Sequence, residues 1–389
     1  MKRNWEYKKL GDVCDYPNQR IAIKELCVGE YVGVENLVKN RGGLIRSTVM
    51  PDADNSIEFH IGDVLIGNIR PYLRKIWLAD FNGGASGDVV VVRVKKEFEN
   101  KLQPSYLYKV LSSEKFFEYD NSNTKGAKMP RGDRKSIAKF LIPVPPLEEQ
   151  SRIVAELDLL TSVIDKQKAQ LKELDTLAQS IFYDMFGDPI ENPKGWDVKK
   201  FCDICEVTSS KRVYQSEWQS TGIPFLRISD FSQLIENNGD INAELFISKE
   251  KYDELKLSDQ VPSAGDILVT ARGTLGVCYI VKKKDCFYFQ DGMITWLKNL
   301  DMQVLSQFIV FLFKNHSFRR QIDKSQSGST VAYLSISMLK KFILPVPPLK
   351  LQQSFAEKIQ SIEKQKETIR ASIADTQKLL DYTMDKYFG

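Results

Sequence analysis

The chain has 389 residues, of which 42% are hydrophobic and 27% charged, with a net charge of +4 and a mean hydropathy of −0.30. This composition excludes a disordered, collagen-like or membrane-spanning protein and leaves room for about two or three domains. The small net charge excludes a histone-like protein, so any affinity for nucleic acid must come from local patches. Two histidines and six cysteines argue against histidine-based catalysis and a disulfide framework. No apolar secretory signal follows the first residues, so we expect a cytoplasmic protein.

One set of segments occurs twice along the chain. Each copy begins with a tryptophan and a Lys-Lys pair, continues with a Gly-Asp-hydrophobic segment and ends with a Pro-hydrophobic-Pro-Pro-Leu motif. The repeated segments are Trp5–Asp15 with Trp196–Glu206, Gly62–Ile66 with Gly265–Val269, and Phe140–Leu147 with Phe342–Leu349. Such a repeat predicts two copies of one structural unit. The second copy carries inserted residues before its Gly-Asp segment, where we expect a surface loop.

The first part of each copy is predicted to be a compact domain. Short β-rich runs between Gly, Asn and Asp turns predict strands at 64–66, 89–94, 267–270 and 278–281. Apolar residues at helical spacing predict one helix at 105–119 and another at 306–322. These patterns indicate two mixed α/β (α+β) domains, at 1–142 and 188–344.

A long helix is predicted after each proline motif, in the segments 143–187 and 345–389. Residues 148–186 contain no Pro or Gly, and apolar residues recur there in alternating steps of four and three, with only Gln167 interrupting the pattern. This seam consists of Ile153, Leu157, Leu160, Ile164, Leu171, Leu174, Ala178, Ile181 and Met185, and in the second copy of Phe355, Ile359, Ile362, Lys366, Ile369, Ile373, Thr376, Leu380, Thr383 and Tyr387. Because neither helix can bury its stripe alone, we expect an antiparallel two-helix coiled coil with pseudo-twofold symmetry. A charged single helix or an intermolecular coiled coil is the alternative.

The motif Phe-Leu-Ile-Pro-Val-Pro-Pro-Leu-Glu-Glu-Gln that ends at Gln150, followed by a heptad helix ending in Phe-Gly and repeated at the C-terminus, resembles the specificity subunit of type I restriction-modification systems. The resemblance covers the full length. It implies two target recognition domains, an asymmetric bipartite target in double-stranded DNA and no catalytic residues in this chain. It also implies docking of two methyltransferase subunits and of restriction/translocase subunits, which would hold S-adenosylmethionine, ATP and magnesium. The second motif lacks the acidic pair Glu148 and Glu149, which leaves room for asymmetric docking.

The resemblance gives the motif and seam residues a role in spacing the domains and docking partners. These residues are Pro145, Pro146, Leu147, Glu148, Gln150, Leu157, Ile164 and Leu171 in the first copy, and Pro347, Pro348, Leu349, Ile359, Ile362 and Ile373 in the second. A spacer of this kind would hold two DNA half-sites about one or two duplex turns apart.

Cations and hydroxyl or amide donors on loops are the groups that contact DNA phosphates and base edges. In the first domain the segment after the Gly-Asp strand and a basic loop supply Arg70, Tyr72, Arg74, Lys75, Lys125, Lys128, Arg131, Arg134 and Lys135. The second domain supplies Arg227, Arg272, Thr274, Ser327, Ser329, Thr330 and Tyr333. Because the two sets differ in chemistry, the domains are expected to read different half-sites. The alternatives are a solvated surface loop for the basic segment and a strand-end ion pair for Arg272.

The sequence carries no strong motif for a catalytic activity. There is no G-x-x-x-x-G-K-[ST] phosphate loop and no Asp/Asn-Pro-Pro-aromatic tetrad of amino-methyltransferases. Pro51-Asp52 with Glu99-x-Lys101 has the letters of a metal-dependent nuclease, but the carboxylates lie far apart and the second half has no copy. A stand-alone DNA nuclease and a coiled-coil adaptor that binds proteins remain as rival functions.

A zinc site is also disfavoured. Cys202 and Cys205 have a ligand-like spacing, but the matching positions of the first copy are Gly11 and Cys14. The pair is therefore not part of the shared fold, and small thiols filling core positions are the preferred interpretation. No metal site is predicted.

Overall fold

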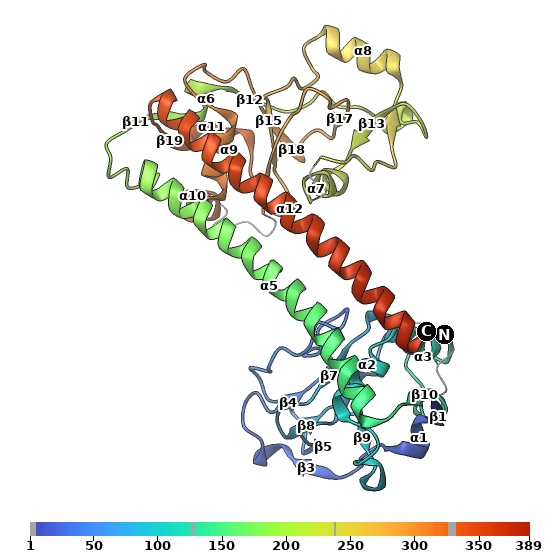
Figure 1. Ribbon diagram of the computed structural model, residues 1–389. Coiled ribbons are helices and arrows are strands. Elements are labelled where there is room, and N and C mark those ends of the chain that lie inside the picture. Colours follow the sequence, from blue (N-terminus) through green and yellow to red (C-terminus); the bar gives the residue numbers. More distant parts are fainter. Residues whose placement is uncertain (1–4, 125, 127–128, 237–238, 326–331) are drawn as a thin grey trace. The chain divides into compact units, whose positions relative to one another are not determined.

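The computed structural model describes residues 5–124, 126, 129–236, 239–325 and 332–389 (Figure 1). Its contacts divide the chain into two units. One unit contains Met1–Ala169 and Ile369–Gly389, and the other contains Gln170–Thr368. Each unit holds one mixed α/β domain, which we call a head, and half of each of two long helices. The mixed α/β architecture predicted for both copies is confirmed.

The first head contains two sheets and a separate strand pair. One sheet has the order β2-β9-β6-β7, the other has the order β3-β5-β8-β4, and β1 pairs with β10. The strands are β1 (Glu6–Lys9), β2 (Cys14–Asp15), β3 (Arg20–Ala22), β4 (Tyr31–Val32), β5 (Asn55–Phe59), β6 (Val64–Gly67), β7 (Ile76–Leu78), β8 (Gly83–Ala85), β9 (Val89–Val94) and β10 (Leu141–Val144). Alternate residues of β6 enter two different cores: Val64 and Ile66 enter one, and Leu65 enters the other. Burial on both faces explains why β6 and residues 89–92 of β9 are continuous apolar runs.

The second head repeats this plan. Its sheets have the orders β12-β18-β15-β16 and β14-β13-β17, and β11 pairs with β19. The strands are β11 (Asp197–Lys200), β12 (Glu206–Thr208), β13 (Ile223–Leu226), β14 (Phe246–Ile247), β15 (Ile267–Thr270), β16 (Cys278–Ile280), β17 (Tyr288–Phe289), β18 (Ile294–Lys298) and β19 (Ile343–Val346). Strands β2, β9, β6 and β7 therefore have counterparts in β12, β18, β15 and β16. The duplication predicted from the sequence is a duplication of the fold.

The aspartate of the Gly-Asp segment has the same task in both heads. Asp63 accepts hydrogen bonds from the backbone N–H of His60 (2.7 Å) and from the Arg93 guanidinium on the neighbouring strand (2.6 and 2.8 Å). Asp266 accepts from the backbone N–H of Ser263 (2.8 Å) and from Trp296 Nε1 (2.9 Å). The carboxylate thus closes the turn before the strand and ties it to the adjacent strand.

The helix expected at 105–119 is in fact two helices, and so is the helix expected at 306–322. The first breaks into α2 (Pro104–Leu111) and α3 (Glu114–Ser122), because Ser113 accepts the Phe116 N–H and caps a new helix. The second breaks into α9 (Ser306–Lys314) and α10 (His316–Ser325) at Asn315, whose side chain accepts the N–H of Ser317. The remaining short helices are α1 (Leu10–Val13), α4 (Arg134–Ile137), α6 (Phe201–Ile204), α7 (Ile228–Glu236), α8 (Lys249–Leu257) and α11 (Ile336–Lys341).

Helices α7 and α8 lie between β13 and β15, where the sequence predicted a surface loop for the inserted residues. That prediction was incomplete. Ser248 caps α8 by accepting the Lys251 N–H at 3.1 Å, and Leu255 of α8 is fully buried in a small core. The insertion therefore has its own apolar contacts rather than being an unsupported loop.

The long helices α5 (Leu147–Phe186) and α12 (Leu349–Phe388) supply the cores of both heads. In the first unit, Ile153 and Leu157 of α5 and Phe388 of α12 belong to the head core. In the second unit, Phe182 of α5 and Phe355 of α12 do the same, with ring centroids 5.7 Å apart. Each head is thus built partly from helix ends, which removes the apolar stripe from water.

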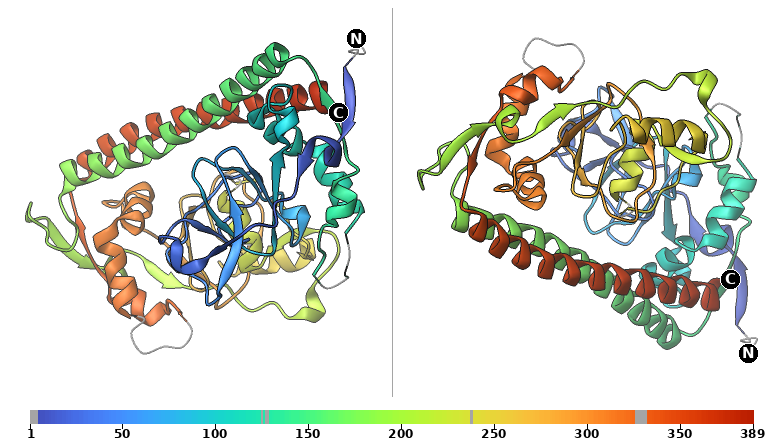
Figure 2. Two further views of the ribbon diagram at one scale, coloured as in Figure 1. Left: turned by 90° about the horizontal axis from the view of Figure 1, so that it is seen from below. Right: turned by 90° about the horizontal axis from the view of Figure 1, so that it is seen from above.

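Within each unit the half of α5 and the half of α12 run antiparallel (Figures 1 and 2). In the first unit, the side chain of Arg152 bonds to Tyr387 Oη (3.1 Å) and that of Gln167 to Ser372 Oγ (2.7 Å). In the second unit, Lys366 Nζ lies 2.7 Å from Asp175 Oδ1. Burial lowers the pKa of Lys366, but hydrogen bonds to Asp175 and Glu363 outweigh it and raise the pKa overall. A lysine at a seam position is therefore tolerated because it is paired.

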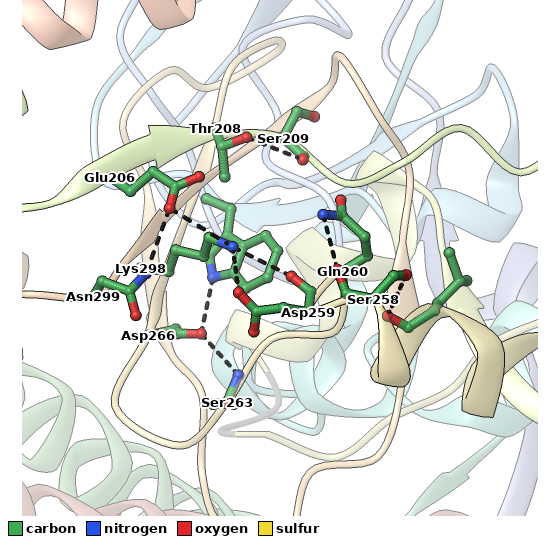
Figure 3. A network of polar contacts seen from close by, with 12 residues as sticks. Glu206, Thr208, Ser209, Ser258, Asp259, Gln260, Ser263, Asp266, Lys298 and Asn299 are labelled. Carbon is green, nitrogen blue, oxygen red and sulfur yellow. Dashed lines mark hydrogen bonds and ion pairs between the residues drawn. The ribbon is translucent and has the colours of Figure 1, made fainter.

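A polar network in the second head joins the loop after α8 to the sheet (Figure 3). Lys298 on β18 is 8% exposed and lies 2.8 Å from Asp259 and 3.7 Å from Glu206. Its Nζ also lies 4.8 Å from the centre of the Trp296 ring, whose Nε1 donates to Asp266. Because the lysine is paired inside the head, this network stabilises the fold and is not a candidate binding site.

Candidate nucleic-acid interface

Two loops of the first head that were predicted to contact DNA lie side by side. The segment after β6 pairs with the basic loop through an antiparallel bridge between Ile69 and Arg131. Arg70 N–H donates to the Pro130 carbonyl at 2.8 Å, and Gly132 N–H donates to the Asn68 carbonyl at 3.0 Å. Residues some sixty positions apart in the sequence thus form one surface.

A third segment, the turn before β9, completes this surface. Arg131 Nη2 lies 3.1 Å from Asp88 Oδ1, and Arg134 Nη2 donates to the Gly87 carbonyl at 3.3 Å. The Arg131 side chain remains 53% exposed, so the ion pair orients the guanidinium without hiding it. Asp88 was not predicted as part of this surface, because an isolated aspartate in a turn does not indicate a partner for a distant arginine.

The predicted residues of this surface differ in accessibility. Arg70, Tyr72, Arg131 and Lys135 are exposed and Arg134 is half-buried. Arg70 has a φ of 53°, a left-handed conformation that side chains other than glycine rarely adopt and that is concentrated at functional sites. Lys125 and Lys128 lie outside the described residues.

Arg74 and Lys75 are half-buried and contact other loops of the first head. Arg74 pairs with Glu114, which also binds Arg41 at 2.7 Å. Lys75 Nζ donates to the Val34 carbonyl at 2.6 Å, and burial lowers the pKa of Lys75. These contacts tie loops of the head together, and a role for either side chain in DNA contact stays a prediction.

A buried carboxyl lies directly behind the basic loop. Asp120 of α3 is 1% exposed, and neither of its carboxyl oxygens has a hydrogen-bond partner among the described residues. A Cβ built on Gly132 would lie 2.7 Å from Asp120 Oδ1 and 2.9 Å from Asn68 Oδ1, so a larger residue there would displace one of these side chains. Burial raises the pKa of Asp120 to about 6. The carboxylate is therefore a destabilising group at neutral pH.

We expect Asp120→Asn to stabilise the first unit at neutral pH. The raised pKa means that the folded state holds the Asp120 proton more tightly than the unfolded state, so the wild type loses stability as pH rises from about 4 to 6. The amide has no such penalty, and the free energy of unfolding should exceed the wild-type value by roughly 2–3 kcal/mol above pH 6. Denaturant unfolding at several pH values measures this difference.

Glu118→Gln, at an exposed position on the same helix, is the matched control. A difference between Asp120→Asn and wild type that stays constant from pH 4 to 7 would contradict the assignment.

The second head forms a matching surface with different chemistry. The Leu334 N–H donates to the Ala271 carbonyl at 3.0 Å, in the place where Gly132 bonds to Asn68 in the first head. Arg272 lies over the Tyr333 ring, with its guanidinium carbon 5.1 Å from the ring centre. Arg272 and Thr274 are exposed. The predicted contacts Ser327, Ser329 and Thr330 lie outside the described residues.

Two further arginines of the second head form ion pairs. Arg212 was not predicted, yet its side chain is 66% exposed and lies 2.9 Å from Asp291, in the turn before β18. Only the Lys-Arg pair at 211–212 hinted at it in the sequence. Arg227, which was predicted to contact DNA, bonds to Asp230 (3.1 Å) and Glu244 (2.8 Å) of its own head. Its role in DNA contact stays a prediction.

The predicted spacer and docking residues fall into two groups. Pro146, Leu147, Glu148 and Pro348 are exposed at the starts of the long helices, and Leu171, Leu349, Ile359 and Ile373 are half-buried. Pro145, Gln150, Leu157, Ile164, Pro347 and Ile362 are buried. The first group is accessible to a partner, whereas the second group packs within its own unit.

The next features concern metal binding and the reactivity of the thiols. Within the described ranges no group of three or more His, Cys, Asp or Glu side chains could hold a metal ion. Cys205 is buried and burial raises the pKa of its thiol to about 12, whereas Cys202 is exposed. Among the helices of the described chain, none is both long and apolar enough to cross a membrane.

The sequence matches one family model over most of its length. The model, described as the type I restriction modification DNA specificity domain, matches residues 2–176 and 193–375. The chain is 24% identical over 378 residues to the type I restriction enzyme MjaVIII specificity subunit of Methanocaldococcus jannaschii, covering 92% of this chain and 86% of that protein. It is 28% identical over 296 residues to a putative type I restriction enzyme specificity subunit of Haemophilus influenzae, covering 75% of this chain and 70% of that protein.

Solved structures share the fold. A chain from a structural study of complex assembly and conformational transition of the type I R-M system superposes with a TM-score of 0.60 at 20% identity, covering 99% of this chain and 97% of that one. The crystal structure of the type I restriction-modification S subunit from M. genitalium gives 0.57 at 14% identity, covering 100% and 97%. At these identities the similarity concerns the fold alone, and it confirms the predicted duplicated mixed α/β architecture with long helices.

Proposed function

Because the chain belongs to the type I restriction modification DNA specificity family, we propose that it binds double-stranded DNA through both heads and reads an asymmetric target with two half-sites. Membership confirms the resemblance drawn from the duplicated proline motif. The observation that supports the proposal is the paired-loop surface, which occurs at the same place in both heads. In the first head it carries Arg70 and Arg131, and in the second Arg272 with Tyr333. Equivalent surfaces with different side chains suit two different base sequences.

The chain would act as the recognition and scaffold subunit of a larger complex. Two methyltransferase subunits would dock on the long helices, and restriction/translocase subunits would join them. In the first unit these helices expose Leu159 (66%), Leu379 (51%) and Tyr382 (68%), apolar area suited to a protein partner. S-adenosylmethionine, ATP and magnesium would be bound by the partners, and this chain would contribute no catalytic residue.

Salt dependence of DNA binding tests this function against the adaptor and nuclease rivals. The chain in complex with its methyltransferase partner would be titrated onto random-sequence and target duplexes between 50 and 200 mM salt. With about four phosphate contacts, affinity should fall roughly 100-fold over that range, because each contact releases a counterion. Absence of DNA binding, or binding that does not respond to salt, would support an adaptor. Cleavage of DNA by the isolated chain with magnesium would instead support a nuclease.

A further inference from the structure

One glutamine occupies the same place in both proline motifs. Gln150 and Gln352 lie in the first turn of α5 and α12, and each has 0% of its surface exposed. The two residues before this glutamine differ between the copies, Glu148 and Glu149 in one and Lys350 and Leu351 in the other. Gln150 was predicted as a spacer or partner-docking residue and Gln352 was not. Both side chains are fully buried and contact their own unit, and docking of a partner on Gln150 stays a prediction.

In the first unit the Gln150 amide joins three backbone groups. Its Oε1 accepts the N–H of Gln103 at 2.9 Å, and its Nε2 donates to the carbonyls of Lys101 and Pro145, both at 2.7 Å. Gln103 is the cap residue of α2 in the head, and Pro145 belongs to the lead-in of α5. One side chain therefore ties the start of a head helix to the start of a long helix.

The second unit reproduces these contacts. Gln352 Oε1 accepts the N–H of Leu305 at 2.9 Å, and its Nε2 donates to the carbonyls of Gln303 (2.9 Å) and Pro347 (2.8 Å). Leu305 is the cap residue of α9, the counterpart of α2. We call these two arrangements the glutamine joints.

Only a primary amide of this length satisfies a glutamine joint. The three backbone groups comprise one donor and two acceptors, and the hydrogen bond to the proline carbonyl is buried in each joint. Glutamate would keep the acceptor but direct a carboxylate at two carbonyl oxygens, and leucine would leave all three groups unpaired. The first joint has additional support, because Tyr106 Oη donates to the Pro143 carbonyl at 3.1 Å. The second head has Phe308 at that position, which has no hydroxyl to donate.

We propose that Gln150 and Gln352 are positioning residues that fix the orientation of each head on its long helix, and thereby restrict the DNA target to one gap between half-sites. The proposal rests on the proposed function, since a gap exists only if both heads read DNA. It predicts that Gln352 is the more sensitive position, because its joint lacks the additional tyrosine hydrogen bond. A head released from its joint would reach half-sites at neighbouring spacings as well.

The test uses the full chain co-expressed with its methyltransferase partner in a host without other adenine methylation. The variants are Gln352→Glu, Gln352→Leu and Gln150→Glu, with the exposed Gln365→Glu and Gln170→Glu as controls of equal charge change. Genome-wide methylation mapping reports the gap, and thermal unfolding reports the fold. Hydrogen exchange at the amides of Leu305 and Gln103 reports each joint directly.

The wild type and both controls should methylate a motif with one gap. Gln352→Glu and Gln352→Leu should add motifs whose gap differs by about one base pair, with the half-sites unchanged and a smaller effect for Gln150→Glu. Exchange at Leu305 in Gln352→Leu should rise about tenfold, as expected for one lost hydrogen bond. Folded variants that keep a single gap, lose methylation uniformly or show unchanged exchange would overturn the proposal. A wild type that methylates no gapped motif, while exchange at Leu305 still responds to Gln352→Leu, would overturn the proposed function instead.

Discussion

Replacing Arg70 and Arg131 together by alanine is expected to weaken binding of the target duplex by about 100-fold or more at moderate salt. Both side chains are exposed on the two loops that bridge at Ile69 and Arg131. Each arginine that contacts a phosphate or a base edge contributes about 1–3 kcal/mol, so losing two such contacts lowers affinity by about two orders of magnitude or more. Fluorescence anisotropy of a labelled duplex at fixed salt measures the affinity.

A control of equal charge separates a specific contact from a general loss of cations. Arg20 and Lys24 are exposed in another segment of the same head, and the double alanine variant there removes the same charge. That control should bind within about threefold of the wild type, because distant charges are screened at physiological salt. An Arg70/Arg131 variant that binds as tightly as this control would remove both residues from the interface.

Inserting one heptad into both long helices, after Ala169 in α5 and before Ile369 in α12, is expected to widen the gap of the DNA target. Seven residues add about 10 Å of helix, which corresponds to about three base pairs. A full heptad keeps the seam in register, so apolar positions such as Ile164 and Ile373 still face the partner helix. Methylation mapping should therefore find both half-sites unchanged and a longer gap.

The same heptad placed in α5 alone provides the comparison. It makes one helix longer than the other between the two units, so pairs such as Gln167 with Ser372 and Lys366 with Asp175 can no longer all keep their register. The unfolding temperature should therefore fall. If the double insertion folds and the gap keeps its wild-type length, the helices do not set the spacing of the half-sites.

The elements that the sequence predicts well are those with strong periodicity. The helix expected at 148–186 is α5, and the strands expected at 89–94 and 267–270 are β9 and β15, because long apolar patterns outweigh local signals. Helix breaks were missed where a polar side chain caps a new helix. At Ser113 and Asn315 a single hydrogen-bonding side chain ends one helix and starts the next, which a 3.6-residue pattern does not register.

The candidate site was predictable in location but only partly in detail. The repeat placed the paired loops at equivalent positions, and the loops do meet in both heads. Gln150 was among the predicted spacer and docking residues, but its contacts were not foreseen, because burial and three backbone partners depend on tertiary contacts with residues 101–103. The burial of Asp120 was not predicted either, because it also depends on tertiary contacts. A charged residue in an amphipathic helix is normally exposed, and the approach of Gly132 to the Asp120 carboxyl is a tertiary contact that the sequence does not reveal.

Genome-wide mapping of adenine methylation, in the host with and without this gene, tests the central claim most directly. The account predicts that deletion removes one gapped, asymmetric motif and that restoring the gene on a plasmid restores it. The Arg70/Arg131 double alanine variant, supplied in the same way, should restore that methylation poorly. Persistence of every motif after deletion, with the methyltransferase partner expressed and active, would contradict the claim that this chain supplies the DNA target sequence.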